Sequence, residues 1–313
     1  MKSHNKPSVA VLGSLNVDLI ASVKALPRAG ETVAAGTMQK LFGGKGANQA
    51  IAVARQSVAV CVIGCVGGDA DGRAYRERMK DEGIDVTGIS IAKDSLTGTA
   101  LIGVAADGEN LIMVAPEANG CVTPELVRRH RRKIESANVL LVQFEVPENA
   151  IIEAIKIANA AGVAVVVNPS PFRNGFPWEQ LRTACVIVNE SEAKQLTGLN
   201  PATMRKQKRK WCDALTRRQI SRLIVTRGDK PTWSLDNQGC LLEVPTLAVE
   251  PIDTVGAGDA FAGAFAAGMA RGERIAEVIA HANCAGALAT LKPGAQEAIP
   301  NRRQTLAAKK SLK

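Results

Sequence analysis

Short runs of β-branched residues alternate with helical segments along most of the chain. We expect strands at residues 9–12, 58–65, 139–144, 163–168, 186–188 and 223–226. Apolar residues at helical spacing predict helices at residues 47–54, 73–81, 124–135, 148–160, 190–197, 205–217, 259–270 and 275–291. Such an alternation is typical of an α/β fold in which helices cover both faces of a largely parallel sheet.

One part of the chain has a different pattern, which predicts a small antiparallel sheet. Residues 97–104 and 110–115 are two apolar runs, and Asp107-Gly108 between them is typical of a hairpin turn. The alternating segment 31–38 could join this hairpin outside the main sheet. Ligands of doubly wound proteins bind at the carboxyl ends of the strands, so a small sheet there would act as a lid. We therefore treat residues 1–313 as one domain, with a lid formed by residues 18–40 and 97–118.

Composition argues against several classes of protein. The 313 residues are 46% hydrophobic, which suffices for a sizeable core. The first apolar run is too short for a secretory signal, and no apolar segment is long enough to span a bilayer. Seven cysteines without a CxxC pair favour free thiols in a reducing cytoplasm.

Much of the formal net charge of +9 lies in two basic runs, residues 128–133 and 205–210. Both runs lie in predicted exposed helices, where a solvated face is the usual explanation. Neither has the aromatic residues or the reader motif that nucleic-acid binding normally adds. We expect no nucleic-acid or membrane partner, whereas small anionic ligands are compatible with the charge.

A glycine-rich loop at residues 253–261 leads into a predicted helix and carries the carboxylate of Asp259. Unpaired N–H groups and the dipole at a helix start attract phosphate, so Ala257, Gly258 and Asp259 can offer donors. Gly256 lets the backbone approach closely. An ionised Asp259 could accept the proton of an attacking alcohol, and the alternative for this residue is a plain helix N-cap.

Other polar residues lie near predicted strand ends. Asn16 and Asp18 follow the first strand, and residues 43–49 open the next helix. Together they supply amides, a carboxylate, an ammonium group and backbone N–H groups, which suit a ligand with several hydroxyls. The alternatives are an Asx-type turn for the first pair and a closely packed helix N-cap for the second segment.

Several familiar signatures are absent from the sequence. Gly46 follows Gly44-Lys45 where a Walker A loop has Ser or Thr, and residues 256–258 lack the third glycine of a dinucleotide fingerprint. The three histidines are too scattered for a metal cluster, and there is no nucleophile elbow. Zinc-dependent and hydrolase functions therefore rank low.

Five motifs, in this order, resemble those of the ribokinase-like (PfkB) sugar kinases. They are Gly13-Ser-Leu-Asn-Val-Asp18, Gly43-Gly-Lys-Gly-Ala-Asn-Gln-Ala50, Asn189-Glu-Ser-Glu192, Thr226-Arg-Gly228 and Asp253-Thr-Val-Gly-Ala-Gly-Asp259. The similarity covers nearly the whole chain. It implies a three-layer αβα sandwich with a β-sheet lid, often a homodimer joined through the lids. It also implies phosphorylation of the 5-hydroxyl of D-ribose by ATP, with Mg²⁺ and K⁺.

The resemblance also implies a role for each matching position. Sugar contacts are implied for Asn16, Val17, Asp18, Gly44, Lys45, Gly46, Ala47, Asn48, Glu145 and Asp259. Asp259 would be the base, beside an anion hole at residues 256–258. Nucleotide contacts are implied for Asn189, Glu192, Thr226, Arg227, Gly228, Asp229, Lys230, Pro231, Gly258, Asp259 and Asn283, of which Asn189 and Glu192 would organise Mg²⁺ through water. A potassium loop is implied at Asp253, Val255, Ala289, Lys292, Gly294 and Ala298.

Four positions differ from the family pattern. Pro231 stands where the nucleotide loop usually has a glycine, and Asn283 replaces a histidine. Ala298 and Glu117 stand where a serine and a glycine are common. Nucleotide contacts, potassium binding and the choice of sugar therefore stay open. A kinase for deoxyribose, another sugar or a nucleoside is one alternative, and a non-catalytic sugar- or nucleotide-binding regulator is another.

Overall fold

The main sheet of the protein is built largely from parallel strands. The computed structural model describes residues 6–312, and among these residues the sheet contains nine strands. They are β1 (Ser8–Leu12), β4 (Ala59–Gly67), β5 (Asp85–Ala92), β8 (Val139–Gln143), β9 (Ala164–Asn168), β10 (Cys185–Asn189), β11 (Arg222–Arg227), β12 (Lys230–Asp236) and β13 (Leu241–Val244). Their spatial order is β13-β12-β11-β10-β9-β8-β1-β4-β5. All neighbours from β11 to β5 are parallel, so their carboxyl ends lie along one edge.

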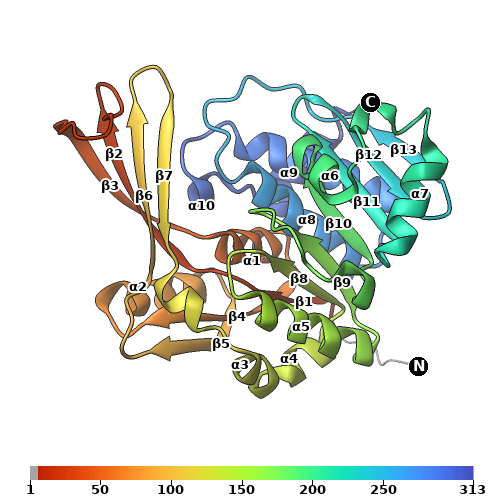
Figure 1. Ribbon diagram of the computed structural model, residues 1–313, viewed down its shortest axis with the longest axis horizontal. Coiled ribbons are helices and arrows are strands. Elements are labelled where there is room, and N and C mark those ends of the chain that lie inside the picture. The colour runs from red at the N-terminus through yellow and green to blue at the C-terminus, as the bar shows by residue number, and fades with distance from the viewer. Residues whose placement is uncertain (1–5, 313) are drawn as a thin grey trace.

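Helices cover both faces of this sheet and complete a three-layer sandwich (Figure 1). The helices are α1 (Lys45–Arg55), α2 (Ala70–Asp81), α3 (Pro124–Arg129), α4 (Arg131–Ser136), α5 (Glu148–Ala161), α6 (Glu190–Thr197), α7 (Lys208–Arg217), α8 (Ala257–Ala270), α9 (Ile275–Ala289), α10 (Ala295–Ala298) and α11 (Arg302–Lys309), with 3-10 turns η1 (Glu117–Cys121), η2 (Trp178–Gln180) and η3 (Pro201–Thr203). Residues of α1, α2, α8 and α9 share one core, and residues of α3 to α7 share the other. Side chains of β1 alternate between the two cores, as the pleat requires.

The first helix packs unusually closely against α8. A Cβ atom placed on Gly263 of α8 would lie 2.4 Å from the Cβ of Ala52 and 2.5 Å from the carbonyl oxygen of Gln49. Only glycine fits there, because side-chain atoms cannot approach so closely. The contact therefore fixes α1 against the N-terminal half of α8.

A second, smaller sheet stands at one end of the sandwich (Figure 1). Its strands are β2 (Asn16–Val23), β3 (Ala35–Gly43), β6 (Gly98–Ala105) and β7 (Asn110–Ala115), in the order β3-β2-β6-β7. The β2/β6 pair is parallel, and the other two pairs are antiparallel. β7 is exposed along its whole length. In the part of the chain that the structure describes, no helix has the length and apolarity needed to cross a membrane.

The structure confirms the α/β fold and the hairpin of the small sheet, and it corrects several element bounds. The helix expected at 124–135 is interrupted at His130, and the one expected from 205 begins at Lys208. The strand expected at 31–38 instead spans Ala35–Gly43. Strands β2, β5, β12 and β13 were not anticipated. Pro231 is the second residue of β12, at an irregularity in the β11/β12 pairing and before the pairing with β13 begins, so its missing N–H costs no ladder hydrogen bond.

Candidate active site

A cavity of about 280 Å³ lies at the carboxyl ends of β9, β10 and β11, beside the start of α8. We call it the central cavity. Its lining residues are Lys45, Asn168, Ser170, Ile187, Val188, Asn189, Glu192, Thr226, Thr254, Gly256, Gly258 and Asp259. Residues from four of the five sequence motifs, far apart along the chain, thus meet around one space.

Asp259 lies in the first turn of α8 and is only 5% exposed. Gly256 caps the helix with φ of 78°, a left-handed conformation that glycine adopts without strain. The carboxylate accepts one hydrogen bond on each oxygen, from Asn48 Nδ2 to Oδ2 and from Gln49 Nε2 to Oδ1, both at 2.9 Å. A carboxylate has about four acceptor positions, so capacity remains for a ligand hydroxyl.

The backbone beside Asp259 partly matches the expected anion hole. The Ala257 N–H donates to the Thr254 carbonyl at 3.3 Å, so this donor is engaged within the turn. The structure describes no protein acceptor for the N–H groups of Gly258 and Asp259. These two donors at the helix start can meet an anion.

Two other predicted residues, Glu145 and Asn16, are held by hydrogen bonds from their neighbours. Glu145 Oε2 accepts hydrogen bonds from Ser14 Oγ and, at 3.0 Å, from the backbone N–H of Lys45. Asn119 Nδ2 donates to Asn16 Oδ1 at 2.7 Å. Asn16 therefore has its amide oriented by a neighbour that the sequence did not single out, and its NH₂ group is directed away from Asn119.

Three further carboxylates act on the Asp18 side chain. Burial, in first place, and the charges of Glu145, Glu297 and Asp259 together raise the pKa of Asp18 to about 7. The carboxylate of Asp259 raises the pKa of Lys45, Glu145 and Glu192 act in the same direction, and burial opposes them. Lys45 thus stays an ammonium group among carboxylates.

Asn189 and Glu192 form a capping box at the start of α6. Asn189 Oδ1 accepts from the Glu192 N–H at 2.8 Å, and Glu192 Oε2 accepts from the Asn189 N–H at 2.9 Å. The structure therefore contains the helix cap at Asn189 and Glu192. Both residues also line the central cavity, so the second oxygen of Glu192 can still take part in binding there.

The segment 226–231 forms the end of β11, a turn and the start of β12. Thr226 lines the central cavity, and its hydroxyl donates to the Val188 carbonyl at 3.3 Å. Arg227 Nε donates to Glu190 at 3.1 Å, and its guanidinium lies 3.7 Å from the centroid of the Trp233 ring. Gly228, with φ of 63°, and the exposed residues 229–231 continue this rim.

Asn283 is 4% exposed and has a structural role. Its Nδ2 donates to the carbonyls of Val244 at 3.2 Å and Pro245 at 2.9 Å, and its Oδ1 accepts from Thr232 at 2.7 Å. These bonds use the amide of Asn283 to hold the chain after β13. The nucleotide contact that the resemblance implies for Asn283 stays a prediction.

The two segments of the expected cation loop lie together. The N–H groups of Ile252 and Asp253 both donate to the Thr290 carbonyl, at 2.8 and 3.1 Å. The Asp253 carboxylate accepts from Val255 at 2.9 Å and from Gly294 at 3.0 Å. Ala289 and Ala298 are buried, whereas Lys292 is exposed. Among residues 6–312, no three His, Cys, Asp or Glu side chains lie together so that they could hold a metal ion.

The sequence did not single out several side-chain amides that surround Asp259, Asn48 and Gln49. Gln49 stands inside the quoted motif 43–50, so its contact with Asp259 could have been found there. Gln143, Asn168 and Gln296 belong to no recognised motif, and only the fold brings them to the site.

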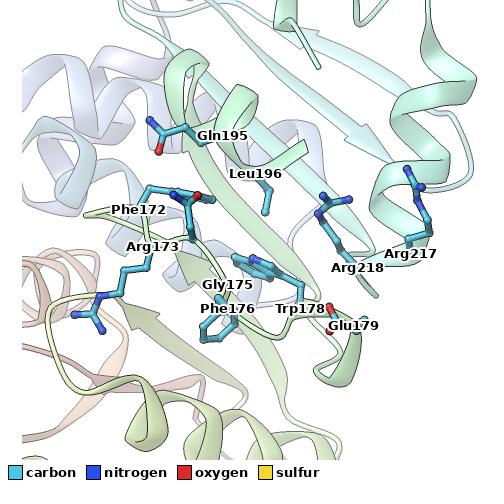
Figure 2. A pocket seen from close by; sticks show the side chains of 11 residues that line it. Phe172, Arg173, Gly175, Phe176, Trp178, Glu179, Gln195, Leu196, Arg217 and Arg218 are labelled. Carbon is cyan, nitrogen blue, oxygen red and sulfur yellow. The ribbon is translucent and has the colours of Figure 1, made fainter. Parts of the chain in front are cut away.

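A separate hollow of about 630 Å³ lies between α6, α7 and residues 172–179 (Figure 2). Arg173 and Arg218 line it, but they donate to the carbonyls of Val146 at 3.2 Å and Ala214 at 3.1 Å. No residue predicted for the site lines this hollow. The central cavity is therefore the better candidate.

Known proteins are similar to this chain in sequence and in fold. A profile described as pfkB family carbohydrate kinase matches residues 6–302. The ribokinase of Haemophilus influenzae is 34% identical over 303 residues, which cover 96% of this chain and 98% of that protein. The ribokinase of Staphylococcus aureus is 37% identical over 296 residues, with coverage of 93% and 96%. The structure of Arabidopsis thaliana ribokinase complexed with ribose and ATP aligns with a TM-score of 0.90 at 28% identity, covering 98% of this chain and 99% of that one.

Asp18 supplies a test of the electrostatics. Its pKa of about 7 in the folded protein lies above the ordinary carboxyl value of 3.8. As pH rises, the unfolded chain therefore loses this proton before the folded protein does, and folding stability falls between these two pH values. Asp18→Asn removes this loss. We expect the melting temperature of the variant to exceed that of the wild type at pH 8 by about 2–6 °C, and the excess to shrink below pH 5. Thermal unfolding at the two pH values measures it.

The control is Asp94→Asn, which removes an exposed carboxylate outside the site. Its difference in melting temperature from the wild type should be the same at both pH values. If the difference in melting temperature between Asp18→Asn and the wild type did not change with pH, the raised pKa of Asp18 would be contradicted.

Proposed function

This chain belongs to the pfkB family of carbohydrate kinases, and we propose that it transfers the γ-phosphoryl group of ATP to the 5-hydroxyl of D-ribose. One observation carries the proposal. Two side-chain amides hold the Asp259 carboxylate at the start of α8. The backbone N–H groups of Gly258 and Asp259 at the same helix start have no described protein acceptor. The naming of its relatives, and the ribose and ATP in the Arabidopsis thaliana structure, support this choice of substrates.

In the proposed reaction, Asp259 accepts the proton of the 5-hydroxyl as its oxygen attacks the γ-phosphorus. The N–H groups of Gly258 and Asp259 face the charge that develops on the transferred group. Asp18, Glu145 and Lys45 hold the other hydroxyls. The small sheet closes over the sugar and excludes water.

The proposed Mg²⁺ would lie near Asn189 and Glu192. The capping box leaves Glu192 Oε1 at the central cavity, and this carboxylate oxygen could accept hydrogen bonds from the waters of a hydrated Mg²⁺. The Asn189 NH₂ group could donate to a phosphate oxygen there. The ion would neutralise phosphate charge. Residues 226–231, at the rim, would contact the nucleotide.

We further propose that K⁺ binds at the loop formed by residues 253–255 and 289–298. The bonds of Asp253 to Val255 and Gly294 hold the two segments together, as a cage of carbonyls needs. The loop runs directly into Gly256 and α8, so a cation there would fix the direction of the neighbouring N–H groups.

We also propose a homodimer joined through the small sheets. Leu101 pairs with Met113, and both lie on the face opposite to Asp18 together with Leu111. These three apolar side chains are 42–56% exposed. An exposed apolar face beside an open edge strand is typical of an interface.

All seven cysteines are free, which supports a reducing compartment such as the cytoplasm.

The base is tested by Asp259→Asn, which keeps the shape but cannot accept the proton. We expect kcat for ribose to fall by about 10²- to 10⁴-fold with ribose binding mostly intact. ADP release measures kcat, and ribose affinity is measured by calorimetry. A near-normal kcat would favour the plain N-cap.

The wild type should be assayed in parallel with pentoses, hexoses and nucleosides. Ribose should give a higher kcat/KM than 2-deoxyribose, because a charged acceptor discriminates against a missing hydroxyl. Equal values would indicate a broader pentose kinase. A lack of ADP release with every sugar would favour the non-catalytic regulator.

Potassium should raise activity more than sodium, because the larger ion suits a cage of carbonyls at the loop of residues 253–255 and 289–298. The measurement is kcat in KCl and in NaCl at constant ionic strength, which removes general screening as an explanation. Identical rates in both salts, with no loss in Asp253→Ala, would show that the loop is only structural.

The wild type should have the mass of a dimer in light scattering, and Met113→Glu should have the mass of a monomer because charge replaces an apolar contact. Leu306→Glu is the control, since Leu306 is exposed on α11, far from β7 in sequence. A monomeric wild type at micromolar concentration would refute the interface.

A further inference from the structure

We propose that Gln296 is a positioning residue for this reaction, because it fixes the orientation of Asn48 and through it the Asp259 carboxylate. The inference rests on the proposed function of Asp259 as the base. Gln296 lies on α10 and is fully buried. It does not line the central cavity, so it would act through another residue and not on the sugar itself.

A chain of hydrogen bonds connects Gln296 to the base. Gln296 Nε2 donates to Asn48 Oδ1 at 3.1 Å and to the Tyr75 hydroxyl at 2.8 Å. Asn48 Nδ2 in turn donates to Asp259 Oδ2 at 2.9 Å. The Tyr75 hydroxyl donates to the Gly43 carbonyl. Four side chains from α2, α10, α1 and α8 thus form one continuous series.

The direction of every bond in this series is determined by its two ends. The Gly43 carbonyl can only accept, so the one proton of the Tyr75 hydroxyl is used there. The Tyr75 oxygen must then accept, which turns the NH₂ group of Gln296 towards it. The same NH₂ group faces Asn48 Oδ1, and the NH₂ group of Asn48 is left to face the carboxylate.

A reversed Asn48 amide would be harmful to the base. It would place Oδ1 against the Asp259 carboxylate, so two acceptors would meet in a buried site. Gln296 opposes this reversal because its NH₂ group would then meet the NH₂ group of Asn48. The backbone also holds Gln296 in place, since α10 follows Gly294, whose N–H donates to Asp253 at 3.0 Å.

The second carboxylate oxygen has a similar support. Gln143 Nε2 donates to Gln49 Oε1 at 2.6 Å, and Gln49 Nε2 donates to Asp259 Oδ1 at 2.9 Å. The base is therefore held from two sides. Loss of Gln296 should free one side while leaving Asp18, Lys45 and Glu145 in place, so the loss should appear mainly in kcat.

The test compares Gln296→Met with Gln56→Met. Gln56 is an equally buried amide that donates to the Pro300 carbonyl at 3.0 Å and has no bond to Asp259 or Asn48. We expect Gln296→Met to lower kcat for ribose by about 10- to 100-fold with less than about a 3-fold change in KM. Gln56→Met should reduce the melting temperature by a similar amount and leave kcat near the wild-type value.

A second variant, Gln296→Glu, keeps the shape but presents only acceptors when ionised. It should favour the reversed Asn48 amide and lower kcat at least as much as Gln296→Met. The proposal is overturned if either Gln296 variant keeps kcat within about 2-fold of the wild type, or if Gln56→Met loses as much kcat. Wild-type protein that phosphorylates no sugar would instead overturn the proposed function, and this role with it.

Discussion

The close contact between α1 and α8 is the interaction on which the rest of the site depends. Gly263 lets the two helices approach to a distance that any side chain would prevent. Asn48 and Gln49 on α1 thereby reach both oxygens of Asp259 on α8. Two segments more than two hundred residues apart in sequence thus form one hydrogen-bonded unit around the proposed base, and a small residue is needed at their interface.

Charge explains why the unliganded site is a compromise. The charges of Glu145 and Asp259 act on Asp18, and the same two carboxylates act on the ammonium group of Lys45. Burial and the neighbouring carboxylates together hold the pKa of Asp18 at about 7. Hydroxyl groups of a ligand would supply donors to these carboxylates. The arrangement is more favourable when filled, which is typical of binding sites that cost folding stability.

The sequence predicted the parts of the protein that have local signals. The alternation of strands and helices identified the sandwich. Two glycine-rich motifs and the motif at residues 189–192 led to Lys45, Asp259 and Glu192, which line the central cavity. It could not predict β2, because Asn16 and Asp18 interrupt the apolar pattern and the strand is stabilised by pairing with β3 and β6. It also could not find Gln296, whose role depends on contacts with distant helices and on no local motif.

Strand β2 links the small sheet to the site in a way that composition does not reveal. Asn16 and Asp18 belong to this strand, and glycines beside them provide the room they need. A Cβ atom on Gly43 would lie 2.1 Å from Asp18 Oδ2, and one on Gly98 would lie 2.5 Å from Asn16 Oδ1. Because Asn16 and Asp18 belong to a strand of the small sheet, any movement of β2 carries these proposed sugar contacts with it. In the proposed reaction, closure of the small sheet and sugar binding would therefore be coupled, because the same strand takes part in both.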